Sequence, residues 1–477
     1  MDVSPMDTIV PRKIISLAED IKAVGGRAML VGGCVRDEIM AVEPKDWDLE
    51  VYQVQPEKLR EILDSIGEVN VVGEAFTVYK IGSDLDVSIP RRERKVGKGH
   101  RGFVVEGDPE MSFEEACSRR DFTINAILKD PLTDEIVDPF DGRSDIERKL
   151  LRHVSSGTFA EDSLRVLRVA QFAARFEFEI DPATIELCKS IDVTDLPKER
   201  IWGELEKLLL KPTRPSTGIR WLYELGVVRQ LFPELQALVG VPQEPEWHPE
   251  GNVDVHTMMV VDEARKLIGE LDHPRQVAVM LGSLAHDFGK PPTTEFVDGR
   301  TRSRGHDEAG VEPTLSFLDT LGIFTLDGYD VRDQVVQLVR YHLKPGEYYK
   351  AKTPVGDGAF RRLARKVEPD LLYRVAKADS LGRNPDWLPK EKWFDSAAQE
   401  WFIAKVKELE IERRAPEPIL MGRHLIEIGL QPSPDFKRIL DAVYELQLDG
   451  KVTDLPAALL LAKAMTASST KDSFSQK

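Results

Sequence analysis

The stretch that decides the fold begins with Ala28-Met29-Leu30-Val31 and continues into Gly32-Gly33-Cys34-Val35-Arg36-Asp37. The apolar run predicts a strand, and the glycine pair predicts a tight turn into a helix. Backbone N–H groups at such a turn can approach a phosphate, and the helix N-terminus favours its negative charge. We expect Gly32 and Gly33 to line a phosphate site and Arg36 to bind the same phosphate, although the glycines alone also fit a simple turn.

Asp46-Trp47-Asp48 follows nine residues after Asp37 and enters a second predicted strand. Side chains two positions apart on a strand share one face. Two carboxylates on one face repel each other unless a cation lies between them, and such oxygen ligands suit Mg²⁺. A third carboxylate, Asp86 or Asp84, is available in or beside the predicted strand at 85–89. A charged strand end in water is the alternative, but the nearby glycine turn favours a magnesium site.

A basic segment follows the predicted acidic strand, with six Lys or Arg against one Glu in the eleven residues 91–101. Gly97, Gly99 and Gly102 predict a flexible loop. Its position favours contact with phosphate or an RNA backbone rather than an ordinary exposed loop. The candidate contact residues are Arg91, Arg94, Lys95, Lys98 and Arg101. Further on, Arg119-Arg120 precedes Asp121-Phe122-Thr123-Ile124-Asn125, and paired arginines beside a metal site fit triphosphate binding.

Asp162 and Arg165 lie on a predicted helix at 159–176, with Arg168 three residues further on. Asp162 can only accept hydrogen bonds and Arg165 can only donate them. Cytosine and adenine each present an amine beside an acceptor nitrogen and satisfy both side chains. Uracil and guanine present the reverse pattern, and buried mismatches cost a few kcal/mol. The pair therefore predicts a reader of C or A, whereas a surface salt-bridge ladder is the alternative.

Composition limits the remaining possibilities. The 477 residues carry a net charge of −17, are 42% hydrophobic and lack the ~18-residue apolar run of a membrane span. At ~150 residues per domain we expect about three domains. The three cysteines Cys34, Cys117 and Cys188 form no disulfide or zinc pattern, and the first residues show no secretory signal, so we expect a cytoplasmic protein without a membrane partner.

The first 140 residues mix predicted strands and helices, whereas the strand signal fades from about Gly142 and helical patterns continue. Six of the nine histidines fall between His248 and His342. His256, His286-Asp287, His306, His342 and Asp379 occur in an order that resembles the HD phosphohydrolase superfamily. All six side chains are candidate metal ligands, and imidazoles with carboxylates suit Ni, Mn, Fe or Zn better than Mg²⁺ alone, so we expect a divalent transition metal such as Ni²⁺ or Mn²⁺. Metal-bound water is then expected to cleave phosphoesters, with Lys290 neutralising the phosphate.

The ordered motifs resemble the bacterial class II tRNA nucleotidyltransferases, the CCA-adding enzymes, over roughly residues 28–210. The motifs are GGCVRD, DWD, RRERK, RRDFTINA, DPFDG, EDSLRVLRVAQFAARF and ERIWGELEKLL. The resemblance implies template-independent addition of C, C and A to tRNA 3′ ends from CTP and ATP. It also implies Mg²⁺ on Asp46 and Asp48, and base reading by Asp162 and Arg165. Nucleotide contacts are implied for Gly33, Arg36, Arg120 and Arg168. Some family members carry an HD domain with phosphatase and 2′,3′-cyclic phosphodiesterase activities, and Trp247-His248-Pro249-Glu250 and Gly305-His306 are similar to theirs.

The resemblance implies an α/β, polymerase-β-like nucleotidyltransferase head followed by all-α regions. We expect a head at 1–141, a helical neck at 142–212, a body at 213–252, an HD domain at 253–390, a tail at 391–465 and a disordered end at 466–477. A monomer or a homodimer is expected.

Three alternatives share some of these motifs. A poly(A) polymerase or a partial enzyme adding only CC or only A has the same head. An HD-type nucleotide phosphohydrolase could use the head only to bind nucleotide, but the presence of Asp46 and Asp48 argues against it. A noncatalytic RNA-binding scaffold would lack these carboxylates and carry a basic charge.

Overall fold

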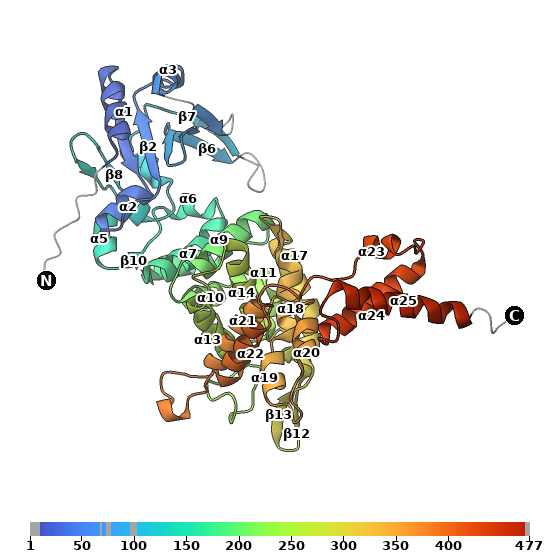
Figure 1. The fold of residues 1–477 in the computed structure, drawn as a ribbon. Coiled ribbons are helices and arrows are strands. Elements are labelled where there is room, and N and C mark those ends of the chain that lie inside the picture. Colours follow the sequence, from blue (N-terminus) through green and yellow to red (C-terminus); the bar gives the residue numbers. More distant parts are fainter. Residues whose placement is uncertain (1–9, 67–68, 73–77, 96–102, 473–477) are drawn as a thin grey trace. The chain divides into compact units, whose positions relative to one another are not determined.

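The computed structural model describes residues 10–66, 69–72, 78–95 and 103–472, and the chain divides into two compact units (Figure 1). The first unit is Met1–Pro233 and the second is Glu234–Lys477. The boundary falls inside the segment expected to form a helical body. The finer division into head, neck, body, HD domain and tail stays a prediction. No helix in the described ranges combines the length and apolarity that a membrane crossing requires.

A mixed seven-stranded sheet forms the start of the first unit, in the order β3-β4-β5-β2-β1-β8-β9. Strand β1 (Arg27–Val31) pairs antiparallel with β2 (Trp47–Tyr52) and β8 (Leu128–Lys129), whereas β2 runs parallel to β5 (Leu85–Ser88). The outer strands are β3 (Val69–Val72), β4 (Val78–Ile81) and β9 (Ile136–Val137). Because β1 is buried along four of its five residues, its apolar sequence fits a central position.

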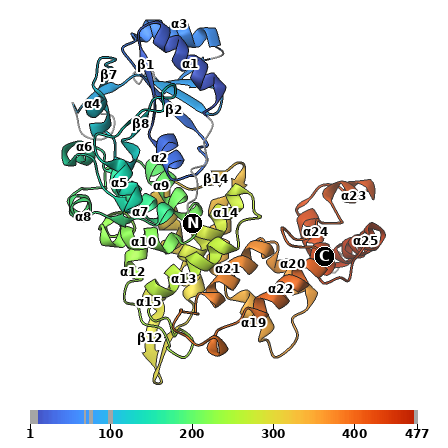
Figure 2. The same ribbon diagram turned by 90° about the vertical axis from the view of Figure 1, so that its left-hand side faces the viewer.

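Short helices surround this sheet. Helix α1 (Arg12–Ala23) packs against β1 and α3 (Pro56–Ile66), as Figure 2 shows, while α2 (Gly33–Ile39) starts directly at the glycine turn. Helix α4 (Phe113–Ser118) is capped by Ser112, which accepts the Glu115 N–H. Its Cys117 joins Met29 and Tyr52 in a buried apolar cluster. All three cysteines of the chain are buried and unpaired.

The first five residues of the basic segment differ from the predicted flexible loop, whereas residues 96–102, which contain its glycines, lie outside the described residues. Arg91–Lys95 forms strand β6, which pairs antiparallel with β7 (Phe103–Gly107). The sequence of β7 is rich in β-branched and aromatic residues, which favour a strand. Whether Arg91–Lys95 forms a strand depends on this partner, which lies outside the basic segment. Lys98 and Arg101 lie outside the described residues, so the prediction for them stands as a prediction.

Helices dominate the rest of the first unit. Helix α7 (Leu164–Phe176) packs against α9 (Lys198–Leu210) and α10 (Pro215–Glu224). The nine residues of α7 that are buried include Val166, Ala170 and Ala173. The other elements are α5 (Gly142–Glu147), β10 (Leu150–Leu151), α6 (Ser156–Ala160), β11 (Glu179–Ile180), α8 (Pro182–Lys189) and α11 (Val227–Leu231), with α12 (Pro233–Ala237) at the boundary.

The second unit is built around α14 (His273–Ala285), which packs against α13 (Val253–Lys266), α18 (Val331–Tyr341) and α21 (Pro369–Leu381). Nine consecutive residues, Val277–Ala285, are buried, as expected for a central helix. The remaining helices are α15 (Lys290–Thr293), α16 (His306–Ala309), α17 (Val311–Leu321), α19 (Lys344–Tyr349), α20 (Asp357–Leu363), α22 (Ala397–Glu408), α23 (Gly422–Glu427), α24 (Pro434–Leu448) and α25 (Leu455–Asp472).

Two expectations for this unit need correction. The region is not purely helical, because β12 (Thr294–Val297) pairs with β13 (Arg300–Ser303) and β14 (Thr325–Leu326) pairs with β15 (Tyr329–Asp330). Helix α25 also extends to Asp472, so residues 466–472 are helical rather than disordered. No proline or glycine interrupts that stretch, which lets the helix continue.

Candidate functional site

The parallel pairing of β2 and β5 places two of the predicted magnesium ligands at the same level of the sheet. Asp48 lies directly opposite Asp86 in the register, and Asp46 immediately precedes β2. The Trp47 N–H donates to the Asp84 carbonyl at 2.8 Å and supports this register. Loss of surrounding water raises the pKa of Asp48, with Arg120 opposing this shift and the charges of Asp86 and Asp46 reinforcing it. Of the two alternatives for a third carboxylate, Asp86 is the one level with Asp48.

The glycine turn lies close to this acidic cluster. Gly32 has φ +72°, a conformation that side chains rarely adopt. A Cβ at Gly32 would approach Arg120 Nη1 to 3.0 Å and Asp48 Oδ2 to 3.8 Å. Arg120 Nη2 also lies 3.8 Å from Glu50 Oε2. The turn, the guanidinium and the carboxylates therefore converge, with Gly33 starting α2.

Arg36 is more enclosed than the phosphate-binding role requires. Its side chain is 4% exposed and donates to Asn125 Oδ1 at 2.6 Å and to Asp37 Oδ1 at 2.6 and 2.9 Å. The guanidinium also lies over the rings of Phe172 and Phe176. A phosphate contact by Arg36 would require these partners to be exchanged, and it stays a prediction.

Asp162 and Arg165 lie at the start of α7 rather than on one continuous helix. Asp162 is in the link between α6 and α7, where its Oδ1 accepts the Leu164 N–H at 3.2 Å. Arg165 donates to the carbonyls of Thr158 at 2.7 Å and Arg119 at 2.6 Å. Neither side chain pairs with the other, so the salt-bridge ladder considered from sequence is absent between these two described residues.

Arg200 is the residue of this region that sequence reasoning missed. Its Nη1 and Nη2 donate to Asp162 Oδ1 and Oδ2 at 3.1 and 2.9 Å, so that both carboxylate oxygens are held. Arg200 lies on α9, inside the ERIWGELEKLL motif. Nothing in the spacing pairs the two residues, because they are 38 positions apart and meet only through the packing of α7 against α9.

Arg168 has a separate partner. Its Nε and Nη2 donate to Asp121 Oδ2 at 2.9 and 2.6 Å, and Asn125 Nδ2 donates to Asp121 Oδ1 at 3.0 Å. Burial alone would raise the pKa of Asp121, but the Arg168 charge and these hydrogen bonds outweigh it and lower the pKa. The network ties the RRDFTINA motif to α7.

The basic strand β6 contains Arg91, Arg94 and Lys95. Its Arg92 is engaged within the unit, donating to Asp108 Oδ2 at 2.8 Å and pairing with Glu115. An RNA contact by the strand stays a prediction.

The second unit gathers the six predicted metal ligands from five elements. His256 lies on α13, His286 and Asp287 follow α14, His306 begins α16, His342 follows α18 and Asp379 lies on α21. The nearest ligand atoms of His256, His286 and Asp287 lie within 4.8 Å of one another, as do those of Asp287, His306 and His342. Asp287 therefore belongs to both triads.

Three of these histidines are oriented in the same way. The Nδ1 atoms of His286, His306 and His342 lie 2.8, 2.7 and 2.6 Å from the carbonyls three residues earlier. Because a carbonyl can only accept, each Nδ1 carries a proton, and Nε2 is the ring nitrogen that can bind a metal when the ring is neutral. Burial and the nearby His306 and His286 lower the pKa of His342 to about 3, so its imidazole is neutral.

Glu250 and Arg383 contact the cluster, and neither was predicted from the sequence as a site residue, although Glu250 belongs to a motif quoted above. Glu250 Oε1 lies 2.7 Å from His256 Nδ1 and 2.9 Å from His248 Nδ1. His256 Nε2 in turn lies 3.1 Å from Asp379 Oδ1, and Arg383 donates to the same oxygen at 3.2 Å. Although burial opposes it, hydrogen bonding to His248 and His256 lowers the pKa of Glu250 to about 2.

The donor sets fit different metals. The predicted ligands of the first unit, Asp46, Asp48 and Asp86, are all carboxylates, which suit Mg²⁺. The second unit offers imidazole nitrogens and carboxylates. His286 Nε2 is buried 3.2 Å from Asp287 Oδ2 and makes no well-aligned hydrogen bond among the described residues. This orphaned nitrogen and the mixed donors fit a transition metal such as Ni²⁺ or Mn²⁺.

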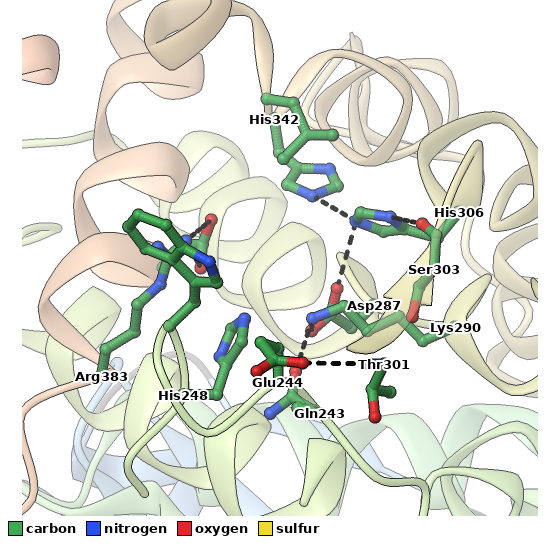
Figure 3. Close-up of a pocket in the computed structure, with 13 residues that line it drawn as sticks. Gln243, Glu244, His248, Asp287, Lys290, Thr301, Ser303, His306, His342 and Arg383 are labelled. Atoms are coloured by element: carbon green, nitrogen blue, oxygen red, sulfur yellow. Dashed lines mark hydrogen bonds and ion pairs between the residues drawn. The ribbon is translucent and has the colours of Figure 1, made fainter. Parts of the chain in front are cut away.

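A pocket of about 230 Å³ opens beside the histidine cluster. Figure 3 shows His306 between Asp287 and His342, at 3.5 Å from Asp287 Oδ1 and 3.2 Å from His342 Nε2. Lys290 Nζ lies 2.7 Å from Asp287 Oδ2 and donates to Gln243 at 2.6 Å. The pocket thus joins the candidate metal ligands to two cationic side chains, Lys290 and Arg383.

Family models match three stretches of the chain. Residues 28–152 match the poly A polymerase head domain, and 177–238 match a probable RNA and SrmB-binding site of polymerase A. Residues 253–384 match the HD domain.

Solved structures share the fold at low sequence identity. A Bacillus stearothermophilus CCA-adding enzyme in complex with CTP is 20% identical with a TM-score of 0.64, over 96% of this chain and 98% of that one. A Thermotoga maritima CCA-adding enzyme complexed with tRNA is 20% identical with a TM-score of 0.56, over 96% and 97%. The predicted fold class, a polymerase-β-like head followed by a mainly helical remainder, is confirmed.

Curated relatives are closer in sequence. The protein named multifunctional CCA protein in Pasteurella multocida is 41% identical over 365 residues, covering 74% of this chain and 83% of that protein. Its namesake in Methylococcus capsulatus is 35% identical over 421 residues, covering 85% and 93%. The chain therefore belongs to the family of multifunctional CCA proteins.

Proposed function

We propose that the first unit adds C, C and A to the 3′ end of tRNA, using CTP and ATP and releasing pyrophosphate. The observation that carries this proposal is the register of β2 and β5, which sets Asp48 beside Asp86 with Asp46 adjacent. The glycine turn and Arg120 lie close to Asp48. Carboxylates, a cation and a glycine turn together suit a nucleoside triphosphate, and the names of the curated relatives support CCA addition.

Each part of this region has a separate task in the proposed reaction. Asp46, Asp48 and Asp86 would hold Mg²⁺, which supplies charge neutralisation for in-line phosphoryl transfer when it is bound. Arg120 and the N–H groups after Gly32 would bind and orient the triphosphate. Asp162 and Arg165 would accept from and donate to the incoming base, and Arg200 would keep the Asp162 carboxylate in place.

The test incubates tRNA transcripts that lack their terminal CCA with CTP, ATP or both, with product length read on a sequencing gel. We expect two C additions with CTP alone and complete CCA with both nucleotides, after which extension stops. Long A tails would indicate a poly(A) polymerase, and extension by only CC or only A would indicate a partial enzyme. No extension would refute the proposal.

We further propose that the second unit hydrolyses phosphoesters, including 2′,3′-cyclic phosphates. The observation that carries this second proposal is the cluster of candidate metal ligands beside one pocket. Four of the ligands line that pocket together with Lys290 and Arg383, namely Asp287, His306, His342 and Asp379. The test measures phosphoester hydrolysis of a nucleoside 2′,3′-cyclic phosphate with and without chelator. Hydrolysis that Ni²⁺ or Mn²⁺ restores after chelation is expected, whereas no hydrolysis with any divalent metal would refute it.

A further inference from the structure

Trp247 lines the pocket beside the histidine cluster, and the proposed hydrolysis does not use it. It lines the same pocket as Asp287 and His342, yet its side chain is 46% exposed while theirs are 1% and 2% exposed. Glu244 fixes the turn that carries it, because its carbonyl accepts the Trp247 N–H at 3.0 Å. Among the described residues, the indole ring has no aromatic or cationic neighbour and its Nε1–H has no acceptor. The pocket therefore has buried candidate metal ligands at one end and the half-exposed indole ring of Trp247 at the other.

The buried end of the pocket is suited to a phosphate. Lys290 is 7% exposed and lies 2.7 Å from Asp287 Oδ2. Arg383 donates to Asp379, but its Nε is buried without a hydrogen-bond partner among the described residues. A guanidinium with a free N–H and an ammonium close to a metal-ligand cluster match the oxygens of a phosphoester. A phosphate held there would leave its organic substituent directed along the pocket.

We propose that Trp247 stacks on the nucleobase of the phosphoester bound beside Asp287. A phosphate subsite at one end and a half-exposed indole at the other match the two recognisable parts of a nucleotide. Stacking on an aromatic ring tolerates every base, because each base has a π-face. The site would then accept nucleotides and RNA ends of any sequence and discriminate against phosphoesters that lack a base. This inference rests on the phosphohydrolase function proposed above.

The kinetic test compares Trp247→Ala with the unaltered full-length chain on two substrates. Cytidine 2′,3′-cyclic phosphate carries a base, whereas glycerol 1,2-cyclic phosphate has the same reacting group without one. We expect kcat/KM for the cytidine substrate to fall roughly 5- to 150-fold, the range that corresponds to loss of one base stack. The value for the glycerol substrate should not change, and Trp247→Phe should retain most of the activity on cytidine.

A matched control uses Trp387→Ala. Trp387 is 67% exposed in the same unit but does not line this pocket, so its loss should affect neither substrate. Equal losses on both substrates in Trp247→Ala would overturn the inference, because they would indicate a role in the fold or at the reacting group. An unchanged ratio between the two substrates would overturn it as well.

A binding measurement separates this inference from the proposed hydrolysis. The chain is labelled with fluorotryptophan, and the resonance absent from Trp247→Phe is assigned to Trp247. We expect cytidine 2′-monophosphate to shift this resonance and glycerol phosphate to leave it in place. A shift in a chain that hydrolyses nothing would refute the hydrolase function and support the stacking site. An unmoved resonance with the cytidine nucleotide would refute the stacking site.

Discussion

Removal of the Arg200 guanidinium should relax the choice of nucleotide in the first unit. Arg200 holds both oxygens of Asp162 with hydrogen bonds of 3.1 and 2.9 Å, and Asp162 also accepts the Leu164 N–H. Without Arg200, the Leu164 N–H is the one hydrogen-bond donor to the Asp162 carboxylate that remains among the described residues, and the carboxylate can rotate. A rotated carboxylate no longer presents its acceptor at a fixed position to the amine of cytosine or adenine.

The size of the effect follows from the exposure of the pair. A hydrogen bond to a charged group contributes ~1.5–3 kcal/mol, whereas an exposed ion pair contributes ~0.2–1 kcal/mol. Both side chains are 33% exposed, so the two-bond pair lies between these limits, at about 1–2 kcal/mol. Since 1.4 kcal/mol corresponds to a factor of ten, we expect Arg200→Ala to reduce discrimination against UTP roughly 5- to 30-fold. Arg200→Lys keeps the charge without the fork and should give a smaller loss.

The assay measures kcat/KM for a single addition of CTP or UTP to a tRNA transcript that lacks its CCA. The control is Arg60→Ala, because Arg60 also bonds both oxygens of a single carboxylate, that of Asp64, at 2.8 and 2.9 Å. This control should leave the CTP-to-UTP ratio unchanged. If Arg200→Ala preserves the ratio and only lowers both rates equally, Arg200 supports the fold rather than base choice, and the reasoning is refuted.

Three further substitutions test other contacts. Asp48→Asn should lower the rate of nucleotide addition roughly 10³-fold. Because the fold raises the pKa of Asp48, its negative charge destabilises the folded chain, so the melting temperature of this variant in EDTA should not fall. Glu250→Ala removes the carboxylate 2.7 Å from His256 Nδ1 and should weaken metal binding by about 10- to 100-fold in a chelator competition. Asp121→Asn should make the free energy of unfolding, measured with urea, fall less steeply below about pH 4 than it does in the unaltered chain. Because Arg168 lowers the pKa of Asp121, the stability from its charge is complete above the unfolded-state pKa and disappears as pH falls through the folded-state value.

Controls and contrary outcomes differ among these tests. Glu246 is an exposed neighbour that pairs with Arg300 at 3.1 Å, and Glu246→Ala should leave metal affinity unchanged. Equal affinity in Glu250→Ala would show that His256 needs no partner on Nδ1. Retained addition by Asp48→Asn would remove that residue from the metal site. An acid-unfolding profile of Asp121→Asn parallel to that of the unaltered chain would mean that Arg168 does not lower the pKa of Asp121.

The sequence was most informative where a function depends on neighbouring residues. Gly32 and Gly33 marked a strand-to-helix turn, and the Asp46-Trp47-Asp48 spacing marked two carboxylates beside a strand. The order of histidines and aspartates in the second half identified an HD domain, which a family model confirms at 253–384. Each of these patterns depends on the spacing or the order of residues along the chain, so it can be recognised in the sequence without knowledge of the fold.

The parts that the sequence did not reveal depend on which elements pack together. Arg200, the partner of Asp162, lies on α9, and β6 forms only by pairing with β7. Neither contact can be predicted from the residues next to Asp162 or within β6. Glu250 lies close to His256 in sequence, but only the fold shows that its carboxylate faces Nδ1. Likewise, the apolar periodicity continued through Asp162, but α7 begins only at Leu164, and the Asp162 side chain accepts the Leu164 N–H just before the helix.

The carbonyl contacts of His286, His306 and His342 have a consequence for assembly of the second unit. Each imidazole ring is oriented by a hydrogen bond to the backbone carbonyl three residues earlier. The three histidines therefore need little reorientation to bind a metal ion, and binding costs little side-chain entropy. Small zinc domains behave differently, because their ion organises the chain and its removal unfolds them. In the second unit, by contrast, a metal ion would bind to a site that is already formed. Chelation should therefore stop the proposed hydrolysis while the helices around α14 remain folded.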